Sequence, residues 1–358
     1  MQDLFFELIQ VALGNRDWLS RVPNAKEWIA LYEESEKQSI VGVMLDGLER
    51  LLNEQMPPKA LLLQWIGVGQ LIEKQNILVN KRCSELVRKI ADDGYRSCLL
   101  KGQGNALMYP HANRRTAGDI DIWIEGGKKK IVKYVHGLFP DISVQYHHMD
   151  FPIFDDVEVE AHYFPSFCYN KIHNRRLQKY FTEKGSSQFD NYAVIEGENI
   201  SIPTVSFNIV FQLSHMMRHF FTQGIGIRHA VDFYYLLCQQ MGEEDMREAV
   251  DVMKRCGMYK FMCAMMYIVH DILGLQYNLS IAPVNEKAGK MVLNEMMKGG
   301  NFGKSFNHNK GNALWMFTKQ MAYRLSYIVE FPSEPLWRPI AHIWDHFENK
   351  YVWKKYNI

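Results

Sequence analysis

The sequence has no closely spaced cysteine pair, no excess of charge of one sign and no long apolar run. Its six cysteines are scattered, which argues against zinc or redox chemistry and indicates reduced thiols in a cytoplasmic protein. Basic residues number 41 and acidic residues 40, so no overall charge marks a duplex nucleic-acid binder. No stretch reaches the roughly 18 apolar residues of a membrane span, and we expect no secretory signal at the start of the chain.

What is present is the composition of a packed globular protein, with 47% apolar and 23% charged residues. In residues 1–93, apolar side chains recur every three or four positions, which predicts an N-terminal helical region. Its last helix is expected to end at Asp92-Asp93-Gly94, because a glycine readily takes the left-handed conformation of a helix cap.

Residues 94–202 change to short segments whose side chains alternate between two faces, which is the pattern of strands. A turn, Lys101-Gly102-Gln103-Gly104, separates the first strand from a helix that begins near Asn105. The expected strands are residues 97–100, 119–124, 142–148 and 157–163, and another helix is expected over 128–139.

Beyond Pro203 the strand patterns disappear and long helical periods return. Residues 203–358 are therefore expected to form a C-terminal helical region. The predicted fold class is α+β, with helical regions on both sides of a small core. The expected helices are residues 206–221, 227–237, 244–256, 259–273, 314–331 and 336–356.

The strand over residues 119–124 carries the first candidate site. Because side chains alternate on a strand, Asp119 and Asp121 share one face with Trp123, and three isoleucines share the other. Two aspartates this close repel one another unless a cation lies between them, and oxygen ligands suit magnesium or manganese. The alternative is an exposed strand whose outer face happens to carry two acids.

Two neighbouring segments add to this site. The Lys101-Gly102 turn is predicted between a strand and a helix, where free backbone N–H groups can hold phosphate oxygens. In residues 157–163, Glu158, Glu160 and His162 share one face of an alternating strand, so a third carboxylate is available for a two-metal site. The alternative for that strand is a solvated acidic face.

Several short segments between residues 95 and 240 together resemble uncharacterised bacterial nucleotidyltransferases of the DNA polymerase β-like superfamily. A looser resemblance reaches the nucleotidyltransferase toxins of abortive-infection systems. The segments are Leu99-Leu100-Lys101-Gly102, Ala106, Tyr109-Pro110, Arg115, Gly118-Asp119-Ile120-Asp121, Glu160-Ala161-His162-Tyr163, His215, His219 and Gly224-Ile225-Gly226 through Asp232.

The resemblance implies a small mixed-sheet core, two magnesium (or manganese) ions and transfer of a nucleoside monophosphate from a nucleoside triphosphate, with release of pyrophosphate. Asp119 and Asp121 would bind both ions, and Glu160 would hold the ion that activates the attacking hydroxyl. These three acids are the predicted catalytic residues. Glu160 departs from the aspartate that is common in relatives, and it reaches one methylene further.

The resemblance also implies a triphosphate site at Gly102 and the amides that follow it, including Gly104. Lys101 and Arg115 would neutralise negative charge there. The sequence departs from the usual Gly-Ser turn, because Gln103 follows Gly102. This departure predicts a rearranged phosphate cradle.

Further candidates for substrate contact are Glu158, His162 and Asp232. Asp232 lies in an apolar helical segment, where an unpaired acid is costly to bury. An ion pair with Arg228, one turn earlier, is the structural alternative. His215 and His219 are better explained as hydrogen-bonded histidines between the helical region and the core than as zinc ligands.

Other functions fit part of the pattern. A glycosyltransferase also uses Asp-x-Asp to hold a metal ion, but its acids normally follow a long α/β region. A catalytically inactive nucleotide-binding module of the same fold would keep the site without the reaction. The acceptor is left undecided among protein, RNA, sugar and small molecule, and a toxin would need a neutralising partner.

Overall fold

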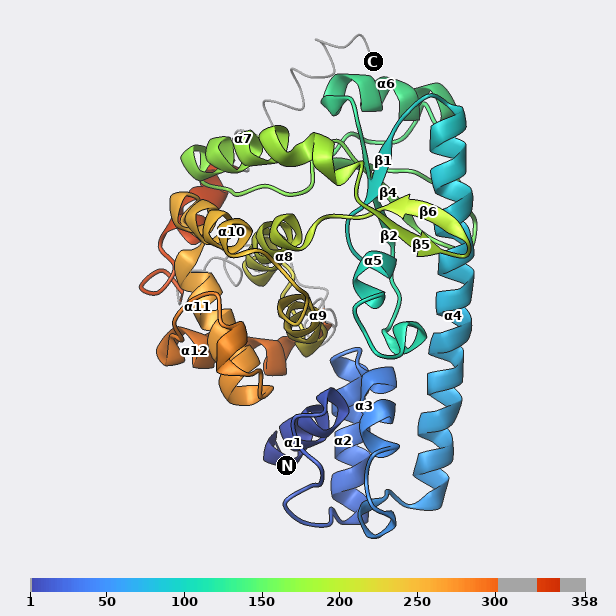
Figure 1. The fold of residues 1–358 in the computed structure, drawn as a ribbon, viewed down its shortest axis with the longest axis vertical. Coiled ribbons are helices and arrows are strands. Elements are labelled where there is room, and N and C mark those ends of the chain that lie inside the picture. The colour runs from blue at the N-terminus through green and yellow to red at the C-terminus, as the bar shows by residue number, and fades with distance from the viewer. Residues whose placement is uncertain (1, 302–326, 342–358) are drawn as a thin grey trace, which may run out of the picture.

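The computed structural model describes residues 2–301 and 327–341. Helices lie on both sides of a small sheet (Figure 1). None of the described helices combines the length and apolar character that crossing a membrane requires. The helices predicted over 314–331 and 336–356 fall largely outside the described residues, although residues 333–341 are helical.

The N-terminal part of the chain is helical, as predicted. A capping box begins α2: the Asn24 side chain accepts the N–H groups of Lys26 and Glu27, and the Glu27 carboxylate accepts the N–H of Asn24. The long helix α4 ends at Asp92, and Gly94 takes a φ of +83°, so the predicted glycine stop is confirmed. The elements are α1 (Gln2–Leu13), α2 (Ala25–Lys37), α3 (Val41–Leu48), η1 (Asn53–Gln55) and α4 (Lys59–Asp92).

A four-stranded mixed sheet follows, in the order β1-β2-β4-β3. The central pair β2–β4 is parallel, and the pairs β1–β2 and β3–β4 are antiparallel. The predicted small mixed sheet is therefore confirmed. Its elements are β1 (Ser97–Leu99), α5 (Gln103–Ala106), η2 (Ala112–Arg114), β2 (Ile120–Ile124), α6 (Gly127–Leu138), β3 (His148–Asp150) and β4 (Val159–His162).

The strand predicted over residues 142–148 is wrong, since only His148 belongs to β3. The segment is irregular instead, with a bend at residues 146–147, and the Gln145 N–H donates to the carbonyl of His148 at 3.1 Å. Tyr163 also donates its hydroxyl to the carbonyls of Gln145 and His148. These bonds use backbone groups that a longer strand would have placed in the sheet.

A helix and a hairpin between the sheet and Pro203 were not among the predicted elements. They are α7 (Lys171–Gln188), β5 (Tyr192–Ile195) and β6 (Glu198–Ser201). Glu196 and Gly197 form the hairpin turn, and both have positive φ values, of 50° and 78°. Two adjacent residues with positive φ are typical of the turns whose twist suits a β-hairpin.

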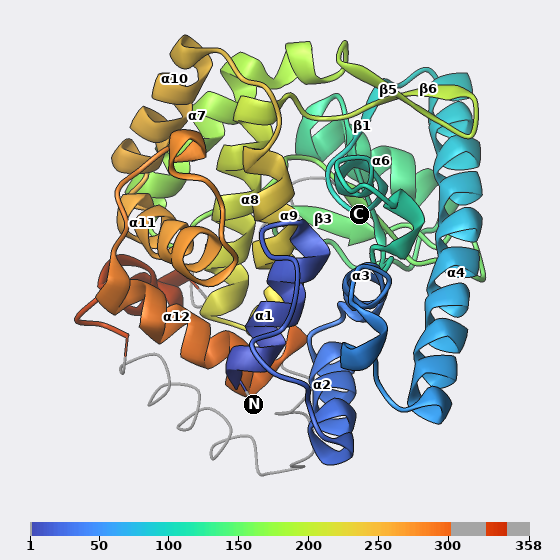
Figure 2. The same cartoon turned by 60° about the horizontal axis from the view of Figure 1, so that its bottom comes forward.

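The C-terminal helices agree with the predicted ranges to within one residue until 259, where the last one changes character. It is an α-helix to Tyr267 and a π-helical turn over Ile268–Ile272. The elements are α8 (Val205–Phe220), α9 (Ile227–Leu237), α10 (Glu243–Arg255), α11 (Tyr259–Tyr267), η3 (Ile268–Ile272), η4 (Tyr277–Leu279) and α12 (Glu286–Gly299). α4 lies on one side of the sheet, and α8 and α9 lie on the other (Figures 1 and 2).

The two faces of β2 pack against different layers, as the alternation of its side chains predicts. The three isoleucines of β2 lie in a buried cluster with apolar residues of α4 and α6. Trp123 lies on the opposite face, with its ring 4.7 Å from that of Phe189 and stacked 5.9 Å from that of Phe207 on α8. Burying an isoleucine side chain contributes about 1.5–3 kcal/mol. The isoleucines therefore determine which face of β2 carries Asp121.

Candidate active site

Three carboxylates meet where β2 and β4 run side by side. Asp119 precedes β2 by one residue, and the parallel register places Asp121 directly opposite Glu160. One carboxylate oxygen from each of these three residues lies within 4.8 Å of the others. Asp121 is only 1% exposed, whereas Asp119 and Glu160 are partly exposed. The three acids predicted as metal ligands are thus brought together.

Lys101 lies against this cluster. Its Nζ is 3.0 Å from Asp121 Oδ2 and 3.8 Å from Asp119 Oδ2. Burial lowers the pKa of Lys101, but the charges of Asp119 and Asp121 outweigh burial and the net pKa is raised. The lysine therefore stays protonated and compensates part of the negative charge of the acids.

His162 contacts the acids on the other side. Its Nε2 lies 3.0 Å from Asp121 Oδ1 and 3.2 Å from Glu160 Oε2. Burial lowers the pKa of His162, but the hydrogen bond with Asp121 and then that with Glu160 outweigh it, so the net pKa is raised. Glu158, in contrast, is exposed just before β4, and its carbonyl accepts the N–H of Ile120.

The Lys-Gly turn approaches the acids through its backbone. Gly102 has a φ of +63°, a conformation that L side chains rarely adopt, and a Cβ on it would lie 3.5 Å from the carbonyl oxygen of Asp119. The following helix α5 is a single turn. Gln103 points its amide at Asn76 and Asn80 of α4. Gln103, which stands where the usual serine would be, thus joins the turn to α4 by hydrogen bonds.

Gly104 serves packing in this turn. A Cβ on it would lie 3.3 Å from Ile202 Cγ2 and 3.5 Å from the carbonyl oxygen of Leu99. Its own N–H donates to the carbonyl of Lys101 at 3.3 Å. Gly104 lines a second pocket beside Ile202, whereas Gly102 lines the pocket that contains Asp119.

Arg115 is held by a buried ion pair with Asp232 of α9. Arg115 Nε and Nη2 donate to the two carboxylate oxygens, each at 2.7 Å, and the Tyr109 hydroxyl donates to Oδ1 at 2.5 Å. Burial raises the pKa of Asp232, but Arg115 outweighs burial and holds it at about 2. The partner of Asp232 is Arg115, so the pairing with Arg228 that the helical spacing suggests is wrong. Arg228 Nη1 donates instead to the carbonyl of Thr116.

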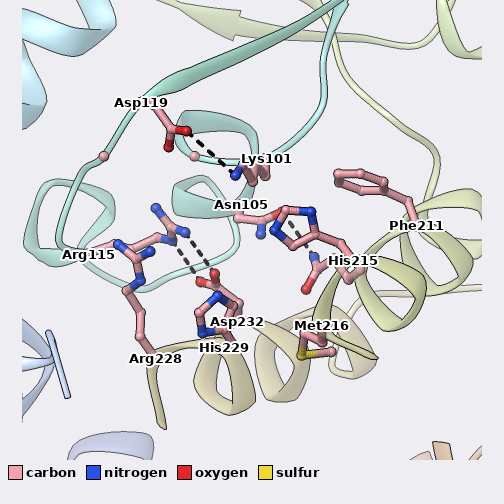
Figure 3. A pocket seen from close by; sticks show the side chains of 13 residues that line it. Lys101, Asn105, Arg115, Asp119, Phe211, His215, Met216, Arg228, His229 and Asp232 are labelled. Atoms are coloured by element: carbon pink, nitrogen blue, oxygen red, sulfur yellow. Dashed lines mark hydrogen bonds and ion pairs between the residues drawn. The ribbon is translucent and has the colours of Figure 1, made fainter. Parts of the chain in front are cut away.

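A pocket lies between Asp119 and the helices α8 and α9 (Figure 3). Lys101 and Asp119 lie on its sheet side, and Arg115, Arg228 and Asp232 lie on the side of α9, as the sticks in Figure 3 show. Three cationic side chains thus surround the space beside the carboxylates. The lining is completed by Gly102, Asn105, Gly118, Phe211, Gln212, His215, Met216 and His229.

One cationic residue was missed altogether by the sequence reasoning, namely Arg218 on α8. Its Nη2 lies 2.9 Å from His219 Nε2 and 3.3 Å from His215 Nδ1. Burial lowers the pKa of both histidines well below the usual value, so they are neutral at pH 7. The spacing His215-x-x-Arg218-His219 on one face of a helix that follows the acidic strands was the signal available.

The model of a family described as "Uncharacterised nucleotidyltransferase" matches residues 24–274, which is more than half of the chain. This span contains all the site residues described above. No curated protein matches the chain. Among solved structures, the chain is similar to an antigenic nucleotidyltransferase-like protein from Paracoccidioides brasiliensis, with 12% identity and a TM-score of 0.36, over 58% of this chain and 95% of that one.

Proposed function

The chain belongs to the uncharacterised nucleotidyltransferase family, and from that premise we propose that it transfers a nucleoside monophosphate from a nucleoside triphosphate to a hydroxyl-bearing acceptor, with release of pyrophosphate. The observation that carries this proposal is the convergence of Asp119, Asp121 and Glu160 within 4.8 Å, with Asp119 also lining a pocket that contains Lys101, Arg115 and Arg228. Carboxylates bind metal ions and cationic side chains bind phosphates, so the region contains residues for both the metal ions and the triphosphate.

The donor set fits divalent magnesium or manganese. All three acids offer hard oxygen ligands, and a buried carboxylate such as that of Asp121 needs a cationic partner. Asp119, Asp121 and Glu160 would hold two ions, which neutralise charge on the phosphates and lower the pKa of the attacking hydroxyl when bound. We propose these three acids as the catalytic residues.

The remaining residues of the pocket bind and orient the triphosphate. Lys101 and Arg115 neutralise phosphate charge, and Arg228 contributes a further guanidinium from α9. Gly102 allows the backbone to take the positive φ of this turn, which L side chains rarely adopt. Asp232 holds Arg115 through two hydrogen bonds of 2.7 Å and so acts as a positioning residue.

Nucleotide transfer can be tested with each of the four labelled ribonucleoside triphosphates, magnesium or manganese, and a cell extract as the source of acceptor. We expect metal-dependent labelling of one acceptor class, together with pyrophosphate release. Asp119→Asn should abolish both, since it removes a metal ligand while keeping the side-chain shape. Asp141→Asn, at an exposed position outside the site, is the matched control and should retain full activity.

Two outcomes would contradict the proposal in different ways. Metal-dependent binding of a nucleoside triphosphate without any transfer would favour an inactive nucleotide-binding module. Labelling that persists in folded Asp119→Asn would place the reaction elsewhere in the protein. Growth arrest on expression, relieved by Asp119→Asn, would identify a toxin and justify a search for its neutralising partner.

The arrangement of the acids argues against the glycosyltransferase alternative. Asp121 lies on the second strand of a four-stranded mixed sheet. Only β1, a strand of three residues, precedes it in that sheet. A long nucleotide-binding α/β region before the acids, which a glycosyltransferase normally has, is therefore absent from the described residues between 2 and 119.

A further inference from the structure

A second group of metal-ligand side chains lies next to the three acids on the same face of the sheet. His148 of β3 pairs directly with His162 of β4, and Glu160 lies two residues before His162. Side chains at these positions project to the same side. One ligand atom from each of His148, Glu160 and His162 lies within 4.8 Å of the other two.

The distances between these atoms fit ligands that share one ion. His148 Nε2 lies 3.5 Å from Glu160 Oε1, and His162 Nε2 lies 3.2 Å from Glu160 Oε2. A further oxygen, Asp121 Oδ1, is 3.0 Å from His162 Nε2. Metal–nitrogen distances of about 2.0–2.1 Å place neighbouring ligand atoms about 3.0–3.5 Å apart. The four side chains therefore need little movement to surround an ion.

The ring nitrogens of the two histidines have different surroundings. His162 is 1% exposed, and its Nε2 is the atom that contacts the carboxylates of Asp121 and Glu160, whereas its Nδ1 has no hydrogen-bond partner in the part of the chain that the structure describes. His148 Nδ1 contacts the ring of His147 at 3.2 Å, which leaves Nε2 directed at Glu160.

We propose that Glu160 also belongs to a further cation site beside the two-ion site of the acids, and that this further site, formed with His148 and His162, binds a divalent transition-metal ion such as Zn²⁺ or Mn²⁺. Imidazole nitrogen suits Zn²⁺ and is also accepted, beside carboxylates, by Mn²⁺, which otherwise shares the oxygen preference of Mg²⁺. The chemistry of the ligands thus separates the two sites: Asp119 and Asp121 provide an all-oxygen end, and the two histidines provide a nitrogen-containing end. The all-oxygen site belongs to the proposed function, and the inference depends on the proposed function only for that site.

Manganese provides the test, because its electron paramagnetic resonance signal reports both binding and ligand type. The full chain is titrated with MnCl₂ in the presence of excess MgCl₂, and pulsed measurements detect nitrogen coupled to the bound ion. We expect Mn²⁺ to remain bound against Mg²⁺ and to show ¹⁴N coupling. The inference is overturned if Mg²⁺ displaces all the Mn²⁺, or if the bound Mn²⁺ has oxygen ligands alone.

Variants assign the coupling to particular residues. His148→Gln should lose the ¹⁴N coupling attributed to β3 and bind Mn²⁺ at least about tenfold more weakly. His111→Gln is the matched control, since the His111 side chain is 55% exposed and pairs with Asp46 away from the site. Unchanged Mn²⁺ binding in folded His148→Gln would refute the assignment. The measurement on the unmodified protein stands even if this variant does not fold.

Asp119→Asn separates this inference from the proposed function. It should abolish nucleotide transfer while leaving the nitrogen-coupled Mn²⁺ in place, because Asp119 is not in the histidine cluster. Nitrogen-coupled Mn²⁺ in a protein that transfers no nucleotide would support the histidine site and contradict the proposed function. The opposite combination is also informative. If the unmodified protein transfers nucleotide, Asp119→Asn does not, and the Mn²⁺ bound to the unmodified protein shows no nitrogen coupling, the proposed function is supported and the histidine site is contradicted.

Discussion

Replacing Asp232 with asparagine tests the buried ion pair that holds one wall of the pocket. Asp232 and Arg115 are each only 4% exposed, and two hydrogen bonds of 2.7 Å join them. Removing one partner of a buried pair costs about 3–5 kcal/mol, because the remaining charge stays buried without compensation. We expect Asp232→Asn to lower the free energy of unfolding by at least about 2 kcal/mol, since asparagine keeps part of the hydrogen bonding.

The pKa of Asp232 gives a second estimate of how much the ion pair contributes to the free energy of unfolding. Burial raises this pKa and Arg115 lowers it, with a net value of about 2 against the usual 3.8. A shift of that size corresponds to about 2.5 kcal/mol. Because the pKa is depressed in the folded state, this stability is present above pH of about 4 and is lost as the pH falls through about 2. The difference between wild type and variant should therefore be constant from neutral pH down to about 4 and shrink below it.

Urea unfolding followed by circular dichroism measures the effect at neutral pH, at pH 4 and at about pH 3, where the difference should begin to shrink. The matched control is Asp251→Asn, because the Asp251 side chain is 64% exposed and lies 3.6 Å from Lys254. Exposed pairs contribute about 0–1 kcal/mol. A loss at Asp232 no larger than the loss at Asp251 would refute the reasoning, and so would a difference that grows as the pH falls.

Three further predictions concern stability alone. Burial raises the pKa of Glu334 to about 7 against the usual 4.5, so the folded state favours its protonated form; stability should fall by up to about 3 kcal/mol as the pH rises from 4.5 through 7, and thermal unfolding of Glu334→Gln should lack this decrease. Ile122→Ala, at a fully buried position, should lower the free energy of unfolding by about 2–5 kcal/mol in urea. Ile172→Ala, at a position 57% exposed, should lower it by less than about 1 kcal/mol. Equal losses in the two variants would contradict the assignment of the core. Gly102→Ala places a side chain on a residue with a φ of +63° and should lower the free energy of unfolding by about 1–3 kcal/mol. Gly137→Ala, with open space around its Cβ in α6, should raise it by about 0.4–1 kcal/mol. The same urea unfolding assay shows whether each change has the expected direction.

The helices were predictable because their signal is local. An amphipathic period that repeats over many residues marks a helix whatever it packs against, and α9 was predicted with its observed bounds. Strands depend on a partner elsewhere in the chain, so short apolar runs mislead. The segment 142–148 had a suitable pattern but is irregular, with a bend at residues 146–147. The hairpin around Glu196 and Gly197 was missed although Glu-Gly between two alternating runs was a usable signal.

The candidate site was predictable in part, for the same reason. Alternation alone placed Asp119 and Asp121 on one face, and the resemblance to a nucleotidyltransferase family, carried by short motifs, is confirmed by the family match over residues 24–274. The toxin relationship, the identity of the nucleotide and the roles of individual residues stay predictions. Arg218 is outside the motifs that carry the resemblance, although its spacing from His215 and His219 on α8 was a local signal.

What the sequence determined by itself is everything that follows from neighbours along the chain: the alternating faces of β2, the glycine turn at Gly102 and the helical periods. Which residues far apart in the chain meet, across paired strands or in a buried ion pair, was decided by tertiary structure alone. Asp121 lies opposite Glu160 because β2 and β4 run parallel, and Arg115 pairs with Asp232 across a separation of 117 residues. The helical spacing favoured Arg228, but burial makes an unpaired acid costly, and the packing of α9 against the loop before β2 brings Arg115 to it.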